Sequence, residues 1–139
     1  MDTSARTPSP SVRQLRLVVT AEDYDAALAF YRDTLGMPEQ ESYSGSDGAL
    51  VTILDAGRAT LELSNPAQVR MIDRIEADGK PSLTLRVALE VDDARKATAA
   101  AVDGGAQLVA EPRETPWRSL NSRLNGPAGL QLTLFEELD

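Results

Sequence analysis

Apolar and polar positions follow the same design in the two halves of the chain. Residues 15–36, LRLVVTAEDYDAALAFYRDTLG, and residues 85–105, LRVALEVDDARKATAAAVDGG, each combine a β-type run with a helix-type run. With an offset of 70 residues, Leu15 aligns with Leu85 and Asp23 with Asp93. The repeat indicates two copies of one structural module.

The first copy predicts a strand over residues 15–20 followed by a helix. Alternate side chains of a strand share a face, so Leu15 falls on an apolar face and Arg16 on a mixed one. Asp23 is a typical helix N-cap, and apolar residues follow it at helical spacing until Gly36. We expect this helix to cover the apolar face of the strand.

Three further strands complete the first module. Their β-rich runs are separated by the glycine-containing segments 44–48 and 55–58, and they cover residues 39–43, 49–54 and 59–64. In the last of them Leu61 and Leu63 share one side, which places Glu62 on the mixed face. The module is therefore predicted as β-α-β-β-β.

Asn65 and Pro66 begin the connection between the modules. An asparagine cap followed by proline at the first helical position predicts a short helix, completed by Val69, Ile72 and Glu76. We interpret residues 65–81 as the linker between the modules, with no strong sign of a function of its own.

The second half repeats the β-α-β-β-β order. A strand over residues 83–91 has alternating polarity, and its helix begins after Asp93. Three strands follow, over residues 107–111, 118–125 and 130–136, and in the last of these Thr133 lies on the mixed face. The predicted fold class is α+β, with two modules forming curved mixed sheets around a cup.

The predicted organisation is a disordered tail over residues 1–12 and a single domain over residues 13–139. Within the domain the first module spans 13–64 and the second 82–137. A chain of 139 residues is of ordinary size for one domain, and the first residues are rich in Ser, Thr and Pro.

Composition narrows the possible functions. The chain contains no cysteine and no histidine, so chemistry must rely on carboxylates, tyrosines, lysines or bound water. The formal net charge is −8 and there is no basic patch, which disfavours nucleic acid as a partner. No apolar run reaches the roughly 20 residues that span a bilayer, and the start lacks the apolar core of a signal peptide. We expect no membrane partner and a cytoplasmic location.

Several segments together resemble the vicinal oxygen chelate superfamily. These are AFYRDTLGM, ATLELS, VALEVDDA and NGPAGLQLTLFE, in this order within two β-α-β-β-β modules. The superfamily includes glyoxalase I, extradiol dioxygenases, fosfomycin and bleomycin resistance proteins and methylmalonyl-CoA epimerase. The resemblance covers residues 14–137 and implies the glyoxalase/bleomycin resistance fold. It does not choose one chemistry, because this fold carries several.

The resemblance also implies where a metal would be bound. Enzymes of the superfamily place ligands on the first and last strands of each module, and the matching positions here are Arg16, Glu62, Arg86 and Thr133. A guanidinium has no lone pair to donate and repels a cation. We therefore expect no metal and no cofactor.

Two interpretations of Arg16, Glu62 and Arg86 stay open at this stage. In the first, the three side chains form a structural ion triad in place of a metal. In the second, two arginines against one carboxylate leave a positive charge that binds an anionic or enol-type ligand. Trp117 is likewise either a lid that stacks on a planar ligand or a hydrophobic plug between the modules.

Further candidates have weaker support. Tyr43 and Glu90 could face the cup and transfer protons, and Asn121 and Arg123 lie near Trp117 in the chain. Phe30 and Tyr31 lie on the predicted helix, where core or interface packing is the expected role.

Three functional hypotheses follow. The first is a metal-independent binding protein of the glyoxalase/bleomycin resistance type that takes a small anionic or planar molecule. The second is a lyase, isomerase or dioxygenase-like enzyme that uses Glu62 as a base. The third is a non-catalytic protein with a vestigial pocket. A homodimer is expected, with the cup formed either within one chain or across two.

Overall fold

The structure of the protein is a computed structural model that describes residues 12–139. The tail predicted for residues 1–12 therefore lies outside the described residues, except Val12. Eight strands form the fold, and their bounds are β1 (Val12–Thr20), β2 (Glu39–Ser44), β3 (Leu50–Ala56), β4 (Ala59–Ser64), β5 (Leu85–Val91), β6 (Gln107–Glu114), β7 (Ser119–Asn125) and β8 (Gln131–Glu137).

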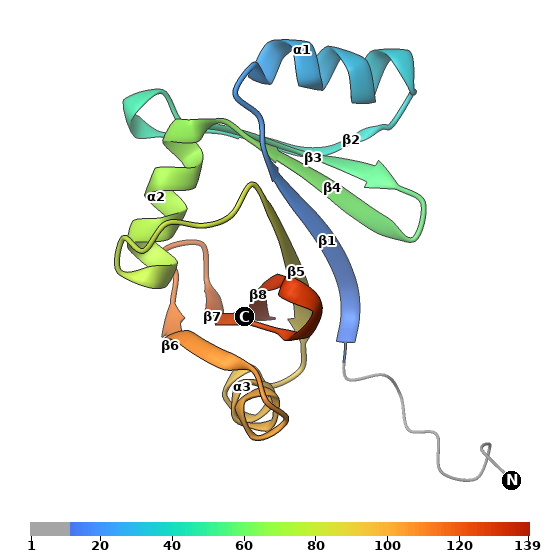
Figure 1. Cartoon of the computed structure of the whole chain (residues 1–139). Coiled ribbons are helices and arrows are strands. Elements are labelled where there is room, and N and C mark those ends of the chain that lie inside the picture. The colour runs from blue at the N-terminus through green and yellow to red at the C-terminus, as the bar shows by residue number, and fades with distance from the viewer. Residues whose placement is uncertain (1–11) are drawn as a thin grey trace, which may run out of the picture.

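Helical segments connect the strands (Figure 1). They are α1 (Tyr24–Leu28), the π-helical η2 (Ala29–Thr34), the short η3 (Ser46–Gly48), α2 (Pro66–Ala77), α3 (Ala94–Asp103) and the short η4 (Pro127–Gly129). Asp23 caps α1 by accepting from the backbone N–H of Ala26 at 3.2 Å, and Asp93 caps α3 by accepting from Lys96 at 3.0 Å. Both predicted N-caps are thus observed.

All strands belong to one sheet with the order β2-β3-β4-β1-β5-β8-β7-β6. Within each module the first strand runs parallel to the last, β1 beside β4 and β5 beside β8. The modules join through antiparallel pairing of β1 with β5, in which Leu17 lies opposite Val87. The predicted α+β fold of two β-α-β-β-β modules is confirmed, and the two modules share one curved eight-stranded sheet.

The helices cover the outer face of the sheet to different extents in the two modules. In the second module Ala94 of α3 packs against Val91, Leu124 and Leu134 in a buried cluster. In the first module no residue of α1 or η2 is fully buried, and Leu15 on β1 is 42% exposed. α1 does contact β4, and Tyr24 is hydrogen-bonded to Thr52 on β3, so the first helix covers the β3–β4 side of its module but not Leu15. The α-helix ends after five residues, and π-helical winding carries the following side chains away from the face set by 3.6-residue spacing.

The linker helix α2 lies on the inner side of the sheet (Figure 1). Asn65 fixes its start, because its side-chain oxygen accepts from the N–H groups of Gln68 at 2.9 Å and Leu50 at 3.0 Å. Its amide nitrogen donates to the carbonyl of Gly48 at 2.8 Å. One residue thus anchors α2 to the β2–β3 connection.

Across residues 12–139 no helix combines the length and apolar character needed to cross a membrane.

Candidate functional site

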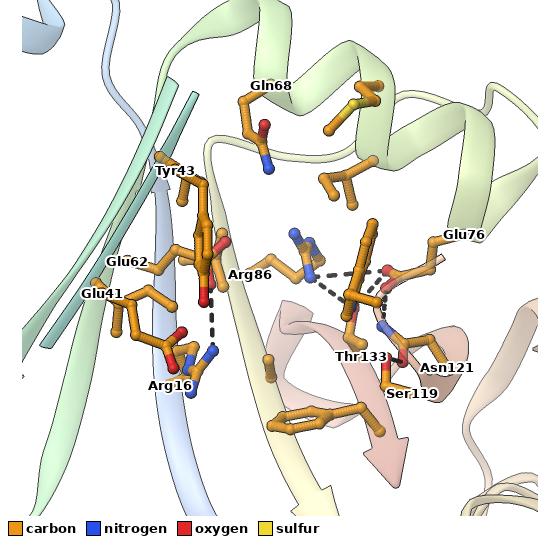
Figure 2. A pocket seen from close by; sticks show the side chains of 18 of the residues that line it. Arg16, Glu41, Tyr43, Glu62, Gln68, Glu76, Arg86, Ser119, Asn121 and Thr133 are labelled. Carbon is orange, nitrogen blue, oxygen red and sulfur yellow. Dashed lines mark hydrogen bonds and ion pairs between the residues drawn. The ribbon is translucent and has the colours of Figure 1, made fainter. Parts of the chain in front are cut away.

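The inner side of the sheet holds a cavity of about 570 Å³ (Figure 2). This volume is in the usual range for small-molecule sites. Both modules and α2 contribute to the wall, so the cup forms within one chain. The residues lining it are Arg16, Val18, Glu41, Tyr43, Ser44, Gly45, Val51, Ile53, Glu62, Gln68, Met71, Ile72, Glu76, Arg86, Ala88, Trp117, Arg118, Ser119, Asn121, Thr133, Phe135, Glu137 and Leu138.

The structure brings the principal predicted site residues together. Arg16, Glu62, Arg86, Trp117 and Thr133 all line the cavity. The strand register shows that two of these residues, Glu62 and Thr133, occupy equivalent positions in the two modules. Glu62 lies opposite Val18 and Thr133 lies opposite Ala88, positions that the 70-residue repeat relates to each other. Thr133 therefore stands in the second module where Glu62 stands in the first.

The secondary candidates are divided between the cavity and other places. Tyr43 and Asn121 line the cavity. Glu90 instead accepts a hydrogen bond from Gln14 at 2.9 Å. Phe30 is 49% exposed on η2 and makes an edge-to-face contact with Tyr31, with ring centroids 5.0 Å apart, so it does not belong to the core.

Glu76 on α2 is the functional-site residue that sequence reasoning missed. Its carboxylate accepts from Thr133 at 2.6 Å, from Asn121 at 2.8 Å and from Nε of Arg123 at 2.9 Å. Nη2 of Arg123 lies 2.7 Å from the same carboxylate. The linker helix thus delivers to Thr133 the carboxylate that the last strand of the second module lacks.

A sequence signal for this role existed. Gln68, Ile72 and Glu76 recur every four residues, so they lie along one face of α2, and all three are buried. Two polar residues within a buried stripe point to hydrogen-bonding partners inside the fold. Residues 65–81 therefore do more than link the two modules, because α2 forms part of the cavity wall.

Arg123 and Asp73 lie behind Glu76 and complete a buried ion cluster. Arg123 is fully buried, and its Nη1 donates to Asp73 at 2.7 Å. Asp73 also accepts from the backbone N–H of Ser82 at 3.2 Å. Arg123, predicted as a cup residue, is therefore a structural partner beneath the cavity.

Arg86 lines the cavity, and one of its N–H donors has no hydrogen-bond partner among the described residues. Its Nη1 donates to Thr133 at 2.6 Å and lies 3.7 Å from a carboxylate oxygen of Glu76. Its Nε has no hydrogen-bond partner among the described residues, although Arg86 is only 7% exposed. An unpaired buried donor carries a desolvation penalty.

Arg16 and Glu62 form a looser pair on the other side of the cavity (Figure 2). Nη1 of Arg16 lies 3.7 Å from Oε1 of Glu62, beyond normal hydrogen-bond distance. The stronger contacts of Arg16 go elsewhere, from Nε to Thr60 at 3.1 Å and from Nη2 to Gln14 at 3.2 Å. Glu62 accepts only a long bond of 3.4 Å from Ser64.

The two cavity carboxylates have opposite pKa shifts. Burial raises the pKa of Glu62, and the attraction of Arg86 and Arg16 reduces this effect without cancelling it. Burial also acts to raise the pKa of Glu76, but Arg86, Arg123 and the hydrogen bonds from Thr133 and Asn121 outweigh it and lower the pKa below the ordinary glutamate value. The environment therefore separates one firmly ionised carboxylate from one that holds a proton more readily.

The charge balance differs from the sequence prediction. The guanidiniums of Arg16, Arg86 and Arg123 are matched by the carboxylates of Glu62, Glu76 and Asp73. The surplus positive charge predicted from two arginines and one glutamate is thus absent from this cluster, because the linker helix supplies Glu76.

Trp117 lies in the turn between β6 and β7 and lines the cavity while 47% exposed. Tyr43, from the other module, also lines the cavity and is 58% exposed. Exposure of this size does not fit a buried plug between the modules. The two aromatic side chains instead border the opening of the cavity, where a planar group could stack.

A sequence model of one family matches residues 13–134, and it describes the Glyoxalase/Bleomycin resistance protein/Dioxygenase superfamily. The chain belongs to this superfamily. The resemblance deduced from the sequence is confirmed. A search of curated proteins gives no match.

Solved structures of the superfamily fold superimpose on nearly the whole chain. A hypothetical protein from Bacillus halodurans C-125 has a TM-score of 0.66 at 18% identity, covering 95% of this chain and 97% of that one. Methylmalonyl-CoA epimerase from Mycobacterium tuberculosis has a TM-score of 0.63 at 19% identity, covering 96% and 93%. A glyoxalase/bleomycin resistance protein/dioxygenase superfamily member from Vibrio splendidus 12B01 has a TM-score of 0.61 at 12% identity, covering 89% and 98%. At these identities the likeness concerns the fold.

The donor set at the superfamily's metal position does not suit a cation. Arg16 and Arg86 offer no lone pair there, Thr133 is already bonded to Glu76 and Arg86, and Glu62 is the single free carboxylate. Within residues 12–139 no group of three or more His, Cys, Asp or Glu side chains is arranged to hold a metal ion.

Proposed function

We propose that this protein binds a small organic anion with a planar body, without a metal at the site. The observation that carries the proposal is the presence of two guanidiniums, Arg16 and Arg86, on the wall of one cavity, with Nη1 of Arg16 held only by a 3.7 Å ion pair to Glu62. A guanidinium suits a carboxylate, since it can donate two parallel hydrogen bonds. Val51, Ile53, Met71 and Ile72 supply an apolar wall for the body of the ligand.

The test combines elemental analysis of the purified protein with a thermal-shift screen against divalent metals, small carboxylates and neutral aromatic compounds. We expect carboxylates with a planar body to raise the melting temperature, and Arg86→Gln to abolish that rise. Arg58→Gln, an exposed change in the β3–β4 turn, is the matched control. A stoichiometric transition metal would overturn metal independence. A screen without any stabilising compound would favour a vestigial pocket.

A second candidate function is proton transfer by Glu62. Glu62 faces the cavity without a short hydrogen bond, and burial raises its pKa toward the range of a general base. An enzyme of this kind would be a lyase or isomerase. Incubation with carbonyl compounds and thioesters in deuterated water should then give deuterium exchange that Glu62→Gln abolishes while the melting temperature is kept.

We further propose that two copies of the chain pair through the outer face of β1 and β5. Leu15, Leu17 and Val19 lie opposite Leu89, Val87 and Leu85, and no charged side chain belongs to this strip. Leu85 is 55% exposed. Rotation by 180° about an axis through the Leu17–Val87 pair places leucine or valine again on each position of the strip. Such a self-complementary surface suits a two-fold contact between identical copies.

The exposed strip on β1 and β5 forms only the centre of the proposed interface. Strand spacing of about 4.8 Å and a rise of about 3.4 Å per residue give these two strands a footprint of roughly 160 Å² over five residues. A stable interface needs about 800 Å² on each partner, so the flanks of α1 and α3 must supply the remaining area.

A cytoplasmic location of the protein also stays a prediction.

A further inference from the structure

The two arginine–carboxylate pairs in the cavity differ in how firmly each carboxylate is held. Glu76 is fixed by Thr133, Asn121 and two nitrogens of Arg123, all at 2.6 to 2.9 Å. Glu62 has an ion pair at 3.7 Å and one hydrogen bond at 3.4 Å. One carboxylate is part of the framework, whereas the other is weakly held.

The contacts of Arg16 leave one nitrogen available. Nε and Nη2 donate to Thr60 and Gln14, and the ring of Phe135 lies 5.7 Å from the guanidinium carbon. These contacts fix the plane of the guanidinium. Among residues 12–139, Nη1 then has one ion-pair partner, Glu62, at a distance where charge attraction acts without a hydrogen bond.

A ligand carboxylate would add a negative charge to a cluster that is already balanced. The side chains of Arg16 and Glu62 are only 18% and 14% exposed, so an extra charge there is poorly screened. The site can accept the anion at low energetic cost if one resident carboxylate moves. Glu76 cannot move without breaking the buried cluster, whereas Glu62 gives up two long contacts and the longer-range attraction of Arg86.

We propose that Glu62 occupies the place of a ligand carboxylate, and that an organic monoanion binds to Arg16 by displacing Glu62, with Arg86 on the same cavity wall adding to the attraction. This inference rests on the proposed anion-binding function. Glu62 is held by its strand at 3.7 Å from Arg16, whereas a free carboxylate can approach to the 2.7 to 2.9 Å of a charge-assisted hydrogen bond. The entering ligand thus makes a better partner for Arg16 than the resident side chain.

Titration with benzoate, followed by calorimetry, tests the inference. We expect Glu62→Gln to bind benzoate about tenfold more tightly than the wild type, because the competing negative charge is gone while the shape is kept. Glu111→Gln is the matched control, since Glu111 is an exposed glutamate on β6 that does not line the cavity. Its benzoate affinity should change less than about twofold. Benzamide, the uncharged analogue, should bind both proteins equally.

The outcomes separate the two proposals. If the wild type binds benzoate and Glu62→Gln binds it equally or more weakly, displacement is wrong while anion binding stands. If neither protein binds benzoate at tens of millimolar, both proposals fail. Equal gains for benzoate and benzamide in Glu62→Gln would also overturn displacement, because the gain would then not depend on charge.

A crystal structure of the wild-type protein with benzoate tests the displacement of Glu62 without relying on the Glu62→Gln variant. In crystals of the wild-type protein soaked with benzoate, we expect one benzoate oxygen within hydrogen-bond distance of Nη1 of Arg16. The Glu62 carboxylate should have moved away from Arg16. Benzoate bound beside an unmoved Glu62 would contradict the inference.

Discussion

At the scale of single residues, Glu76 decides the character of the site. It is 1% exposed and balances Arg86 and Arg123, which would otherwise be buried charges with too few partners. Through Thr133 it also fixes Arg86, the side chain to which we assign ligand binding. A helix outside the repeated modules therefore sets the electrostatics of the cavity.

Glu76→Gln should lower the free energy of unfolding by about 3 kcal/mol, because neutralising one member of a buried ion cluster leaves its partners uncompensated. Urea unfolding measures the change. Asp78→Asn is the control, since Asp78 pairs with Arg113 at the surface with its side chain 66% exposed. Asp78→Asn should leave the unfolding midpoint nearly unchanged. A similar loss in both variants would contradict a special role for Glu76.

The pH dependence of stability should have a definite sign for Glu76. Its pKa in the folded protein lies below the ordinary value of 4.5. A carboxylate with a lowered pKa stabilises the fold fully above its unfolded pKa, and this contribution is lost as the pH falls through the folded pKa. The difference in unfolding free energy between the wild type and Glu76→Gln should therefore shrink below about pH 4.5. A difference that stays constant down to pH 3 would contradict the shift.

At the scale of elements, α2 has the firmest start of the three α-helices. Asn65 accepts from two backbone N–H groups and donates to Gly48, whereas Asp93 at the start of α3 accepts only from Lys96. The cap of α2 thus joins a helix to a strand and a loop. Since α2 carries Gln68, Met71 and Glu76 into the cavity, its position also determines the shape of the site.

Asn65→Ala should destabilise the protein by about 2 kcal/mol, because it removes a helix cap and leaves further backbone groups without partners. Asp93→Ala removes a cap alone and should lose about 1 kcal/mol. Chemical unfolding of both variants provides the comparison. Equal losses would show that the bonds of Asn65 to Leu50 and Gly48 add nothing.

At the scale of the whole molecule, the exposed apolar strip on β1 and β5, between α1 and α3, is the feature that indicates a binding partner. Exposed leucines on a sheet face are costly in water, and a second copy with the same strip would cover them. The proposed pair leaves the cavities free, because they lie on the opposite face of each sheet.

Leu85→Asp should convert the proposed dimer into a monomer, because a pair related by two-fold symmetry would bury the new charge twice. Analytical ultracentrifugation measures the mass. Leu108→Asp on the edge strand β6, where Leu108 is 40% exposed, is the control and should keep the dimer. A wild-type monomer at high concentration would rule out the pair.

The sequence by itself determined the order of the elements and the residues of the two first strands. Alternation in a strand is a local property, so the repeat was enough to place Arg16 and Arg86 on one face and to identify the superfamily. The same reasoning placed Glu62 and Thr133 on that face. Their roles in binding stay predictions.

The tertiary structure alone decided what these residues meet. Glu76 and Thr133 are far apart in the chain, and only the docking of α2 onto β7 and β8 brings them to 2.6 Å. The balance of charge and the unpaired Nε of Arg86 follow from that contact, which no local pattern encodes. The exposed outer strip has the same origin, because local spacing predicts which helix face is apolar but not which strands the helix covers.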